Sequence, residues 1–169
     1  MSVTAVYPGT FDPFTNGHID LVMRGRRIFP RLIVAVAGNP QKQPFFSIEE
    51  RLAIIREAIG GLEGVEIDCF NALTVDYVRA KGAQIILRGV RAVSDFEFEF
   101  AMALMNRKIS EDVETLFLMP NQNYSFLSSR LVKEVAMLGG NVSEFVPPLA
   151  ERLLKERARQ LPSRERRNP

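Results

Sequence analysis

The sequence is poor in the residues on which several kinds of enzyme chemistry depend. It contains no tryptophan, one cysteine (Cys69) and one histidine (His18) among 169 residues. One histidine cannot build a multi-histidine metal site within a single chain, and one cysteine cannot form an internal disulfide. We interpret Cys69, in the strand-like run VEIDCF, as a core residue rather than a nucleophile.

Several motifs and segment types are also missing. No G-x-G-x-x-G follows the first strand-like run and no Walker loop occurs, which excludes dinucleotide reduction and P-loop hydrolysis. There is no G-x-S-x-G nucleophile elbow. There is also no long apolar run, and no basic segment followed by an apolar one at the N-terminus. We therefore expect no transmembrane helix, no secretory signal and a reducing, cytoplasmic setting.

Positive charge is concentrated at the end of the chain. Residues 151–169 contain seven Lys or Arg and three Glu, a net charge of +4, whereas the whole chain carries +2. A basic tail can bind nucleic acid, but this one lacks interleaved aromatic residues, and the rest of the chain has no basic excess to support it. We expect a solvated last helix and a flexible basic tail at 161–169, with neither nucleic acid nor membrane as partner.

Strand-like and helix-like runs alternate, which predicts one α/β domain over residues 1–160. The strand-like runs are rich in Val, Ile, Leu and Phe with weak alternation, which is typical of parallel strands covered on both faces. They span residues 3–7, 32–37, 65–70, 84–87 and 114–118. The pattern predicts a Rossmann-like, doubly wound, five-stranded parallel sheet of order 3-2-1-4-5, with flanking helices and a C-terminal helix.

Residues suited to N-capping precede most helix-like runs. Ser47 and Ser94 are each followed three residues later by Glu, the spacing of a capping box. Thr74 precedes another run, and Ser128 or Ser129 precedes a run that stops at a pair of glycines. We expect these residues to cap their helices.

Two segments suited to phosphate follow the first and fourth strands, which are neighbours at the switch point of the predicted sheet. YPGTFDPFTNGH (residues 7–18) brings Thr10 and His18 to the start of a helix. RGVRAVSD, after the fourth strand, contains Arg88 and Arg91. Guanidinium groups, hydroxyls and the free N–H groups of a helix start all bind phosphate oxygens. We expect an anion site between the two segments.

Weaker signals come from neighbouring loops. Lys42, after the second strand, can reach a phosphate, and Ser128 with Ser129 lies near a helix N-terminus. Gly9 and Gly89 lack a Cβ and so permit a backbone to approach a ligand closely. Each feature alone also fits a surface lysine, a helix cap or a turn. Their convergence on one edge of the sheet favours a binding site.

Phe96, Phe98 and Phe100 are spaced two apart in a helix-like run. A helix cannot bury all three on one narrow face. We expect most of them in the core or in a subunit interface.

These motifs together resemble a known family. GTFDP (9–13) followed by TNGH (15–18) resembles the T/H-x-G-H signature of the nucleotidyltransferase superfamily. With RGVR (88–91), which leads to DFE, and SS (128–129) before LVKE, the chain resembles the bacterial phosphopantetheine adenylyltransferases over about residues 3–150. The resemblance implies adenylyl transfer from ATP to 4′-phosphopantetheine, giving 3′-dephospho-coenzyme A and pyrophosphate. This is the penultimate step of coenzyme A synthesis. The resemblance also implies Mg²⁺, which would be held largely by ATP phosphates and water.

The resemblance also implies roles for individual residues. His18 would stabilise the transition state, with Thr10, Lys42 and Arg91 completing the catalytic set. Phosphopantetheine would be bound by Thr10, Lys42, Thr74 and Arg88. ATP would be bound by Thr10, Phe11, His18, Gly89, Val90, Arg91, Glu99, Tyr124, Ser125, Phe126, Leu127, Ser128, Ser129 and Arg130.

Two positions depart from the family's common pattern. Tyr124 stands where tryptophan is frequent, and Arg130 where a third serine or threonine is frequent. The resemblance further implies a homohexamer and feedback by coenzyme A. The alternatives are a related nucleotidyltransferase with another phosphorylated acceptor, such as nicotinamide mononucleotide, and a non-catalytic nucleotide-binding module.

Overall fold

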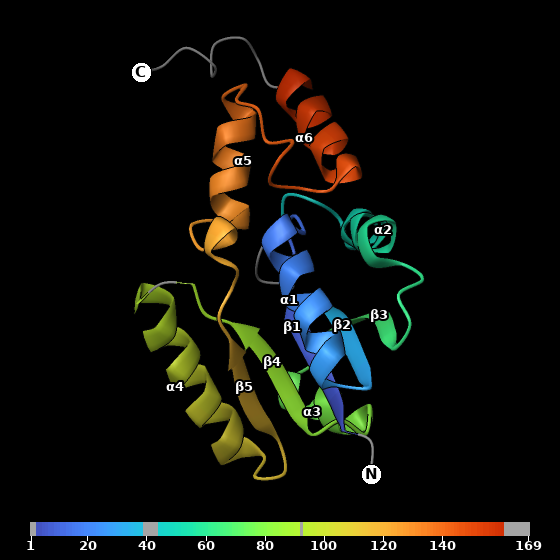
Figure 1. Ribbon diagram of the computed structural model, residues 1–169, viewed down its shortest axis with the longest axis vertical. Coiled ribbons are helices and arrows are strands. Elements are labelled where there is room, and N and C mark those ends of the chain that lie inside the picture. Colours follow the sequence, from blue (N-terminus) through green and yellow to red (C-terminus); the bar gives the residue numbers. More distant parts are fainter. Residues whose placement is uncertain (1–2, 39–43, 92, 161–169) are drawn as a thin grey trace.

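A five-stranded parallel sheet forms the centre of the computed structural model, which describes residues 3–38, 44–91 and 93–160 (Figure 1). The strand order is β3-β2-β1-β4-β5, which confirms the predicted order 3-2-1-4-5. The third and fifth strands have the predicted bounds, and the others differ from them by a residue or two at either end. The strands are β1 (Thr4–Gly9), β2 (Arg31–Ala37), β3 (Val65–Phe70), β4 (Ile85–Gly89) and β5 (Glu114–Leu118).

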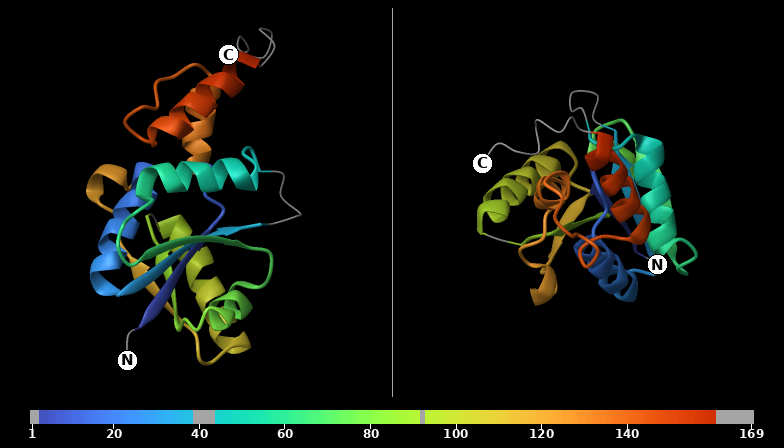
Figure 2. Two further views of the ribbon diagram at one scale, coloured as in Figure 1. Left: turned by 90° about the vertical axis from the view of Figure 1, so that its right-hand side faces the viewer. Right: turned by 90° about the horizontal axis from the view of Figure 1, so that it is seen from above.

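Helices cover both faces of the sheet and extend beyond one end of it (Figures 1 and 2). The last two helices pack on each other past the carboxyl ends of the strands (Figure 1). The helices are α1 (Asn16–Ile28), α2 (Ile48–Ile59), α3 (Thr74–Ala80), α4 (Val93–Ile109), the short 3-10 helix η1 (Gln122–Tyr124), α5 (Ser129–Met137) and α6 (Pro148–Gln160).

Hydrophobic cores lie on both faces of the sheet. Ala5 and Tyr7 of β1 belong to the core under α1 and α2, whereas Val6 belongs to the core under α3. Burial on both faces explains why the strands read as continuous apolar runs. The larger core also includes Ala150 and Leu154 of α6, so the C-terminal helix packs on the rest of the chain.

Two of the predicted helix caps are confirmed. Ser47 caps α2 with a capping box: its hydroxyl accepts from the Glu50 N–H at 3.2 Å, and Glu50 Oε2 accepts from the Ser47 N–H at 2.8 Å. Ser128 caps α5, because its hydroxyl accepts from the Leu131 N–H at 3.1 Å. Local sequence spacing was sufficient for Ser47, whereas for α5 the structure decides between Ser128 and Ser129.

The other two predicted caps are wrong. Ser94 lies inside α4, which begins at Val93. Thr74 is the first residue of α3, and the capping position is Leu73, which makes no side-chain cap. In both cases the helix begins earlier than its capping residue indicated, and Thr74 instead lines the cavity described below.

The core placement expected for Cys69 is wrong, and the core alternative for the three phenylalanines of α4 is excluded. Cys69 is exposed, because it lies on β3, an edge strand of the sheet. Phe96, Phe98 and Phe100 on α4 are 47%, 66% and 48% exposed, so they do not belong to the core of this chain. Their place in a subunit interface stays a prediction.

Two further expectations concern the membrane and the tail. In the part of the chain that the structure describes, no helix has the length and apolar character needed to cross a membrane. The predicted basic tail, 161–169, lies outside the described residues.

Candidate active site

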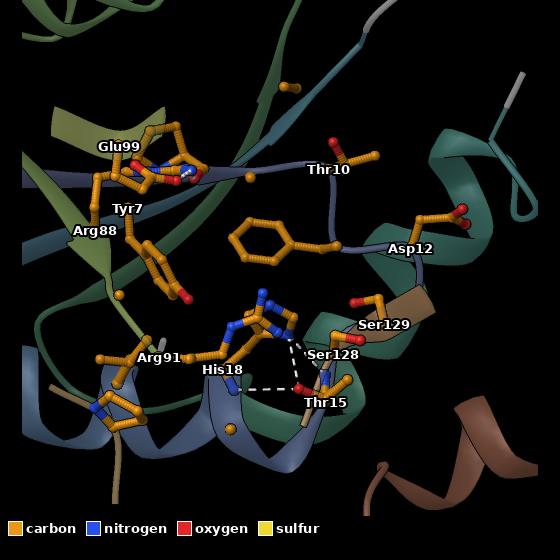
Figure 3. A pocket seen from close by; sticks show the side chains of 18 of the residues that line it. Tyr7, Thr10, Asp12, Thr15, His18, Arg88, Arg91, Glu99, Ser128 and Ser129 are labelled. Carbon is orange, nitrogen blue, oxygen red and sulfur yellow. Dashed lines mark hydrogen bonds and ion pairs between the residues drawn. The ribbon is translucent and has the colours of Figure 1, made fainter. Parts of the chain in front are cut away.

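A cavity of about 920 Å³ opens at the carboxyl ends of β1 and β4, where the sequence predicted an anion site (Figure 3). Its walls come from the turn between β1 and α1, the first turn of α1, the end of β4, one face of α4 and the N-terminus of α5. In a doubly wound sheet this switch point is the usual place for a ligand.

His18 is held in one orientation by the start of α1. The N–H of Thr15, the N-cap, donates to His18 Nδ1 at 2.9 Å, and the Thr15 hydroxyl accepts from the His18 N–H at 3.4 Å. Because Nδ1 accepts a hydrogen bond from the backbone, the ring proton of neutral His18 belongs on Nε2. Thr15 was missed in the sequence, although a threonine three residues before a polar side chain is the signal of a reciprocal cap.

Burial also keeps His18 neutral. Desolvation, with Arg91 and Arg88 nearby, lowers the pKa of His18 from 6.5 to about 3. Phe14 stacks on the imidazole ring at 5.3 Å between centroids, and Phe11 meets it edge-on at 5.1 Å. His18 is therefore a preoriented neutral hydrogen-bond donor at neutral pH, not a general acid.

Protein atoms occupy the space beside Gly9 and Gly89, two of the three glycines that line the cavity. A Cβ on Gly9 would lie 2.7 Å from ring carbons of Phe11, which has a positive φ of 49°. A Cβ on Gly89 would lie 2.4 Å from Leu21 of α1. Within this chain the missing Cβ atoms make room for a phenylalanine ring and a packed helix, and the close approach of the backbone to a ligand at these glycines stays a prediction.

The arginines of the fourth strand form part of the cavity wall. Arg88 makes a two-pronged contact with the Glu99 carboxylate, with Nε to Oε2 at 2.7 Å, and Nη1 donates to the Pro8 carbonyl at 2.6 Å (Figure 3). Arg91 Nη1 donates to the Leu127 carbonyl. The pairing of Arg88 with Glu99 joins β4 to α4 and fixes the guanidinium at the cavity.

The N-terminus of α5 forms the opposite wall. The Ser129 hydroxyl donates to the Pro13 carbonyl at 2.8 Å, which ties α5 to the turn before α1. Arg130 lies at the rim, its side chain 90% exposed and paired with Glu134 at 2.9 Å. The free N–H groups of this helix start suit an anion.

Most of the predicted site residues are brought together here. Val90, Ser125 and Phe126 do not line the cavity, and Lys42 lies outside the described residues. Their roles stay predictions. Those that do line it are Thr10, Phe11, His18, Thr74, Arg88, Gly89, Arg91, Glu99, Tyr124, Leu127, Ser128, Ser129 and Arg130.

One arm of the cavity was not predicted. It runs between α4 and the strands β4 and β5. On α4, Glu99, Ala103 and Asn106 are the partly buried positions among the side chains that the structure describes. Their spacing of four and three residues marks one helix face, but exposed apolar neighbours hide that pattern in the sequence. The arm is lined by Ile86, Phe98, Met102, Ala103, Asn106 and Thr115.

The described residues offer no ready cage for a metal ion. No group of three His, Cys, Asp or Glu side chains comes together among them. The cavity carboxylates in this part of the chain are Asp12 and Glu99, and each is already bonded to a basic side chain. A divalent ion here would depend on ligands brought by a substrate.

Comparison with known proteins defines the class of this chain. The family model described as cytidylyltransferase-like matches residues 6–135. A putative nicotinate-nucleotide adenylyltransferase from Vibrio parahaemolyticus shares the fold, with a TM-score of 0.66 and 18% identity over 95% of this chain and 98% of that chain. A bifunctional NMN adenylyltransferase/ADP ribose pyrophosphatase from Francisella tularensis gives a TM-score of 0.68 at 15% identity, over 92% of this chain and 49% of that chain.

Closer relatives carry one name. The phosphopantetheine adenylyltransferase of Alkalilimnicola ehrlichii is 57% identical over 93% of this chain and 91% of its own length. Those of Ralstonia pickettii and Legionella pneumophila (strain Paris) are 56% and 53% identical, over 92% and 95% of this chain and 93% and 96% of their own lengths. The chain belongs to the phosphopantetheine adenylyltransferase family, within the cytidylyltransferase-like proteins.

Proposed function

We infer that this chain transfers the adenylyl group of ATP to 4′-phosphopantetheine, forming 3′-dephospho-coenzyme A and pyrophosphate in the penultimate step of coenzyme A biosynthesis. The observation that carries this inference is a neutral His18 whose Nε2–H is available in a cavity shared with Arg88 and Arg91. The sequence identity to phosphopantetheine adenylyltransferases supports the choice of acceptor.

The reaction needs no nucleophile from the enzyme. The acceptor's own phosphate, with a second pKa of about 6, is largely dianionic at neutral pH. One of its oxygens bonds to the α-phosphorus of ATP, while the bond from that phosphorus to the bridging oxygen breaks and pyrophosphate leaves with the electron pair. The protein positions two anions in line and stabilises charge on the α-phosphoryl group. His18 Nε2–H and the Thr10 hydroxyl are the donors we assign to that group.

The α4 arm suits the pantetheine chain. Phe98, Met102 and Ala103 offer apolar surface for its methyl groups, and Asn106 and Thr115 offer polar groups for its amides. Thr74 and Arg88 also line the cavity, and we assign them to the acceptor. We assign the acceptor to this side, with Lys42 retained as a predicted phosphate ligand.

The α5 side suits ATP. Tyr124 and Leu127 line the cavity there, and Ser128, Ser129 and Arg130 surround a helix N-terminus that attracts phosphates. We assign the nucleotide to this wall, together with Gly89 and with Arg91, which donates to the Leu127 carbonyl. Magnesium enters as the complex with ATP, since the described residues hold no metal cage of their own.

We further propose a homohexamer in which α4 is covered. The α4 helix exposes a row of large apolar side chains, more than single scattered surface residues explain. Coenzyme A contains both the pantetheine and the adenosine halves of the product, so feedback follows from competition for the same cavity. The exposed apolar residues of α4 are Phe96, Phe98, Phe100, Met102, Leu104, Met105 and Ile109.

The domain and location predictions fit this function. Residues 1–160 act as one domain in this proposal, because one core includes Ala5 of β1 and Leu154 of α6. The cytoplasmic setting stays a prediction that accords with a lone free cysteine.

A product assay tests the function. The protein is mixed with magnesium, ATP and 4′-phosphopantetheine, and parallel reactions contain nicotinamide mononucleotide or nicotinate mononucleotide. We expect pyrophosphate and the mass of dephospho-coenzyme A in the first reaction alone. Turnover only with a mononucleotide would overturn the acceptor and retain the adenylyl transfer. Absence of turnover with every acceptor, despite ATP binding, would favour a binding module.

A further inference from the structure

Asp12 is a buried carboxylate two residues after Thr10, on the turn between β1 and α1. It is 7% exposed. Its Oδ1 accepts from the Phe46 N–H at 2.8 Å, and its Oδ2 accepts from the Phe45 N–H at 2.9 Å and from Lys133 Nζ at 2.6 Å. Figure 3 shows the side chain directed away from His18. Its oxygens are therefore used by the protein itself.

The groups around Asp12 come from four separate segments. Asp12 belongs to the β1–α1 turn, Phe45 and Phe46 precede α2, and Lys133 belongs to α5. Arg157 of α6 completes the cluster, since its guanidinium lies 5.6 Å from the Phe45 ring centroid and donates to the Phe45 carbonyl at 3.1 Å. We call these five residues the Asp12 cluster.

The charge balance of the cluster makes it sensitive to single changes. A buried carboxylate is costly unless it is paired and hydrogen-bonded, and here two N–H groups and one ammonium meet that need. Removing Lys133 takes away the cation that is hydrogen-bonded to the carboxylate and leaves Arg51, which also interacts electrostatically with Asp12, as a more distant one. The turn that carries Thr10 then loses one of its ties to α5, and the hydrogen bond from Ser129 to the Pro13 carbonyl remains.

We propose that Asp12 is a positioning residue for adenylyl transfer, acting through its contact with Lys133. It holds the Thr10 turn against α5, so that Thr10 and His18 on one wall and Ser128 with Ser129 on the other face the same phosphates. The proposal rests on the function inferred above. It adds a residue that binds no substrate and yet sets the distance between two walls of the site.

The test is a double-mutant cycle on Asp12→Asn and Lys133→Met. Turnover at saturating substrates is expressed per ATP-binding site, counted by titration calorimetry, so that misfolded protein does not enter the result. We expect each single variant to lower kcat about 10- to 100-fold, the cost of a small misplacement. The double variant should be no slower than the slower single, because both changes break one contact.

Lys155→Met is the matched control. Lys155 pairs with Glu151 on the surface of α6, away from the cavity, and its loss should leave kcat unchanged. Lys133→Arg keeps a cation and should stay within roughly threefold of wild type. If Asp12→Asn does not fold, the comparison of Lys133→Arg with Lys133→Met carries the test, and equal losses would overturn the proposal.

Three other results would also overturn it. Losses that multiply in the double variant would mean that Lys133 acts on substrate directly. Unchanged kcat per site in both single variants, with only a lower melting temperature, would make the cluster purely structural. A wild-type enzyme that forms no dephospho-coenzyme A in the parallel reaction would instead remove the function on which the proposal rests.

Discussion

His18 owes its chemistry to its position at the start of α1. The same backbone N–H that completes the helix cap takes the Nδ1 lone pair, and this leaves the Nε2–H for a ligand. Two phenylalanine rings hold the imidazole in place. A donor oriented in advance stabilises developing charge without reorganising at the moment of reaction.

Removal of this donor should be felt mainly in turnover. We expect His18→Ala to lose on the order of 10²–10³-fold in kcat, as for loss of a preorganised donor to a transition state. ATP affinity should change far less, since the arginines and helix N-termini remain. Steady-state kinetics with calorimetric ATP titration measure both. A variant with near wild-type kcat would contradict the assigned role.

The lowered pKa of His18 also predicts a pH dependence of stability. The group is neutral in the folded chain down to about pH 3, whereas in the unfolded chain it takes up a proton near its ordinary pKa of 6.5. The unfolded state therefore binds more protons between these values, and stability falls as pH falls through that window. Within this window the contribution of His18 to the free energy of unfolding falls by about 1.4 kcal/mol for each pH unit.

Urea unfolding of wild type and His18→Gln at several pH values isolates this share. The difference in the free energy of unfolding between the two proteins should be constant above pH 6.5. Below pH 6.5 the wild type should lose stability relative to His18→Gln as the pH falls. Carboxylates titrate in both proteins and cancel in the difference. A difference that is flat with pH would mean that His18 is not held neutral by burial.

At the scale of elements, the capping box of α2 is a local device that the sequence shows directly. Ser47 and Glu50 satisfy two N–H groups at the start of a helix that carries five buried residues. Ser47→Ala should lower the free energy of unfolding by about 1 kcal/mol in urea, while Ser47→Asp, another good N-cap, should retain most of it. Equal losses in the two variants would contradict a capping role.

Elements defined by local pattern were predictable, and features that depend on the placement of one element against another were not. The strand runs and the cap at Ser47 lie in contiguous sequence. The exposure of Cys69 depends on which strand ends at the sheet edge, which periodicity does not encode. The α4 arm likewise depends on how α4 sits against β4 and β5, so Asn106 carried no sequence signal.

In the predicted site, too, residues in a local motif were predictable, and contacts between distant segments were not. His18, Arg88 and the serines before α5 were found because phosphate-binding residue types follow the ends of neighbouring strands. Asp12 lies inside the same motif, but its partners Phe45 and Lys133 are far away in the sequence. Only the fold shows that this acidic residue ties segments together.

At the scale of the whole molecule, the end of the chain divides into two parts with different expected effects. Arg157 contacts Phe45 and pairs with Glu50 at 2.9 Å, so α6 braces the segment that precedes α2. Residues 161–169 carry Arg164, Arg166 and Arg167, three of the basic residues considered for nucleic-acid binding. Two truncations separate these parts.

A chain ending at residue 160 should keep wild-type kcat and melting temperature, because it retains α6 and the contacts of Arg157 described above. A chain ending at residue 155 loses Arg157 and should melt several degrees lower, as expected for a loss of about 1 kcal/mol or more. Turnover with ATP and 4′-phosphopantetheine, thermal melting and salt-dependent RNA binding are measured on both. If RNA affinity falls steeply with salt and is lost when residues 161–169 are removed, the result would support nucleic-acid binding by the tail. Loss of turnover in the chain ending at 160 would show that the tail contributes to catalysis.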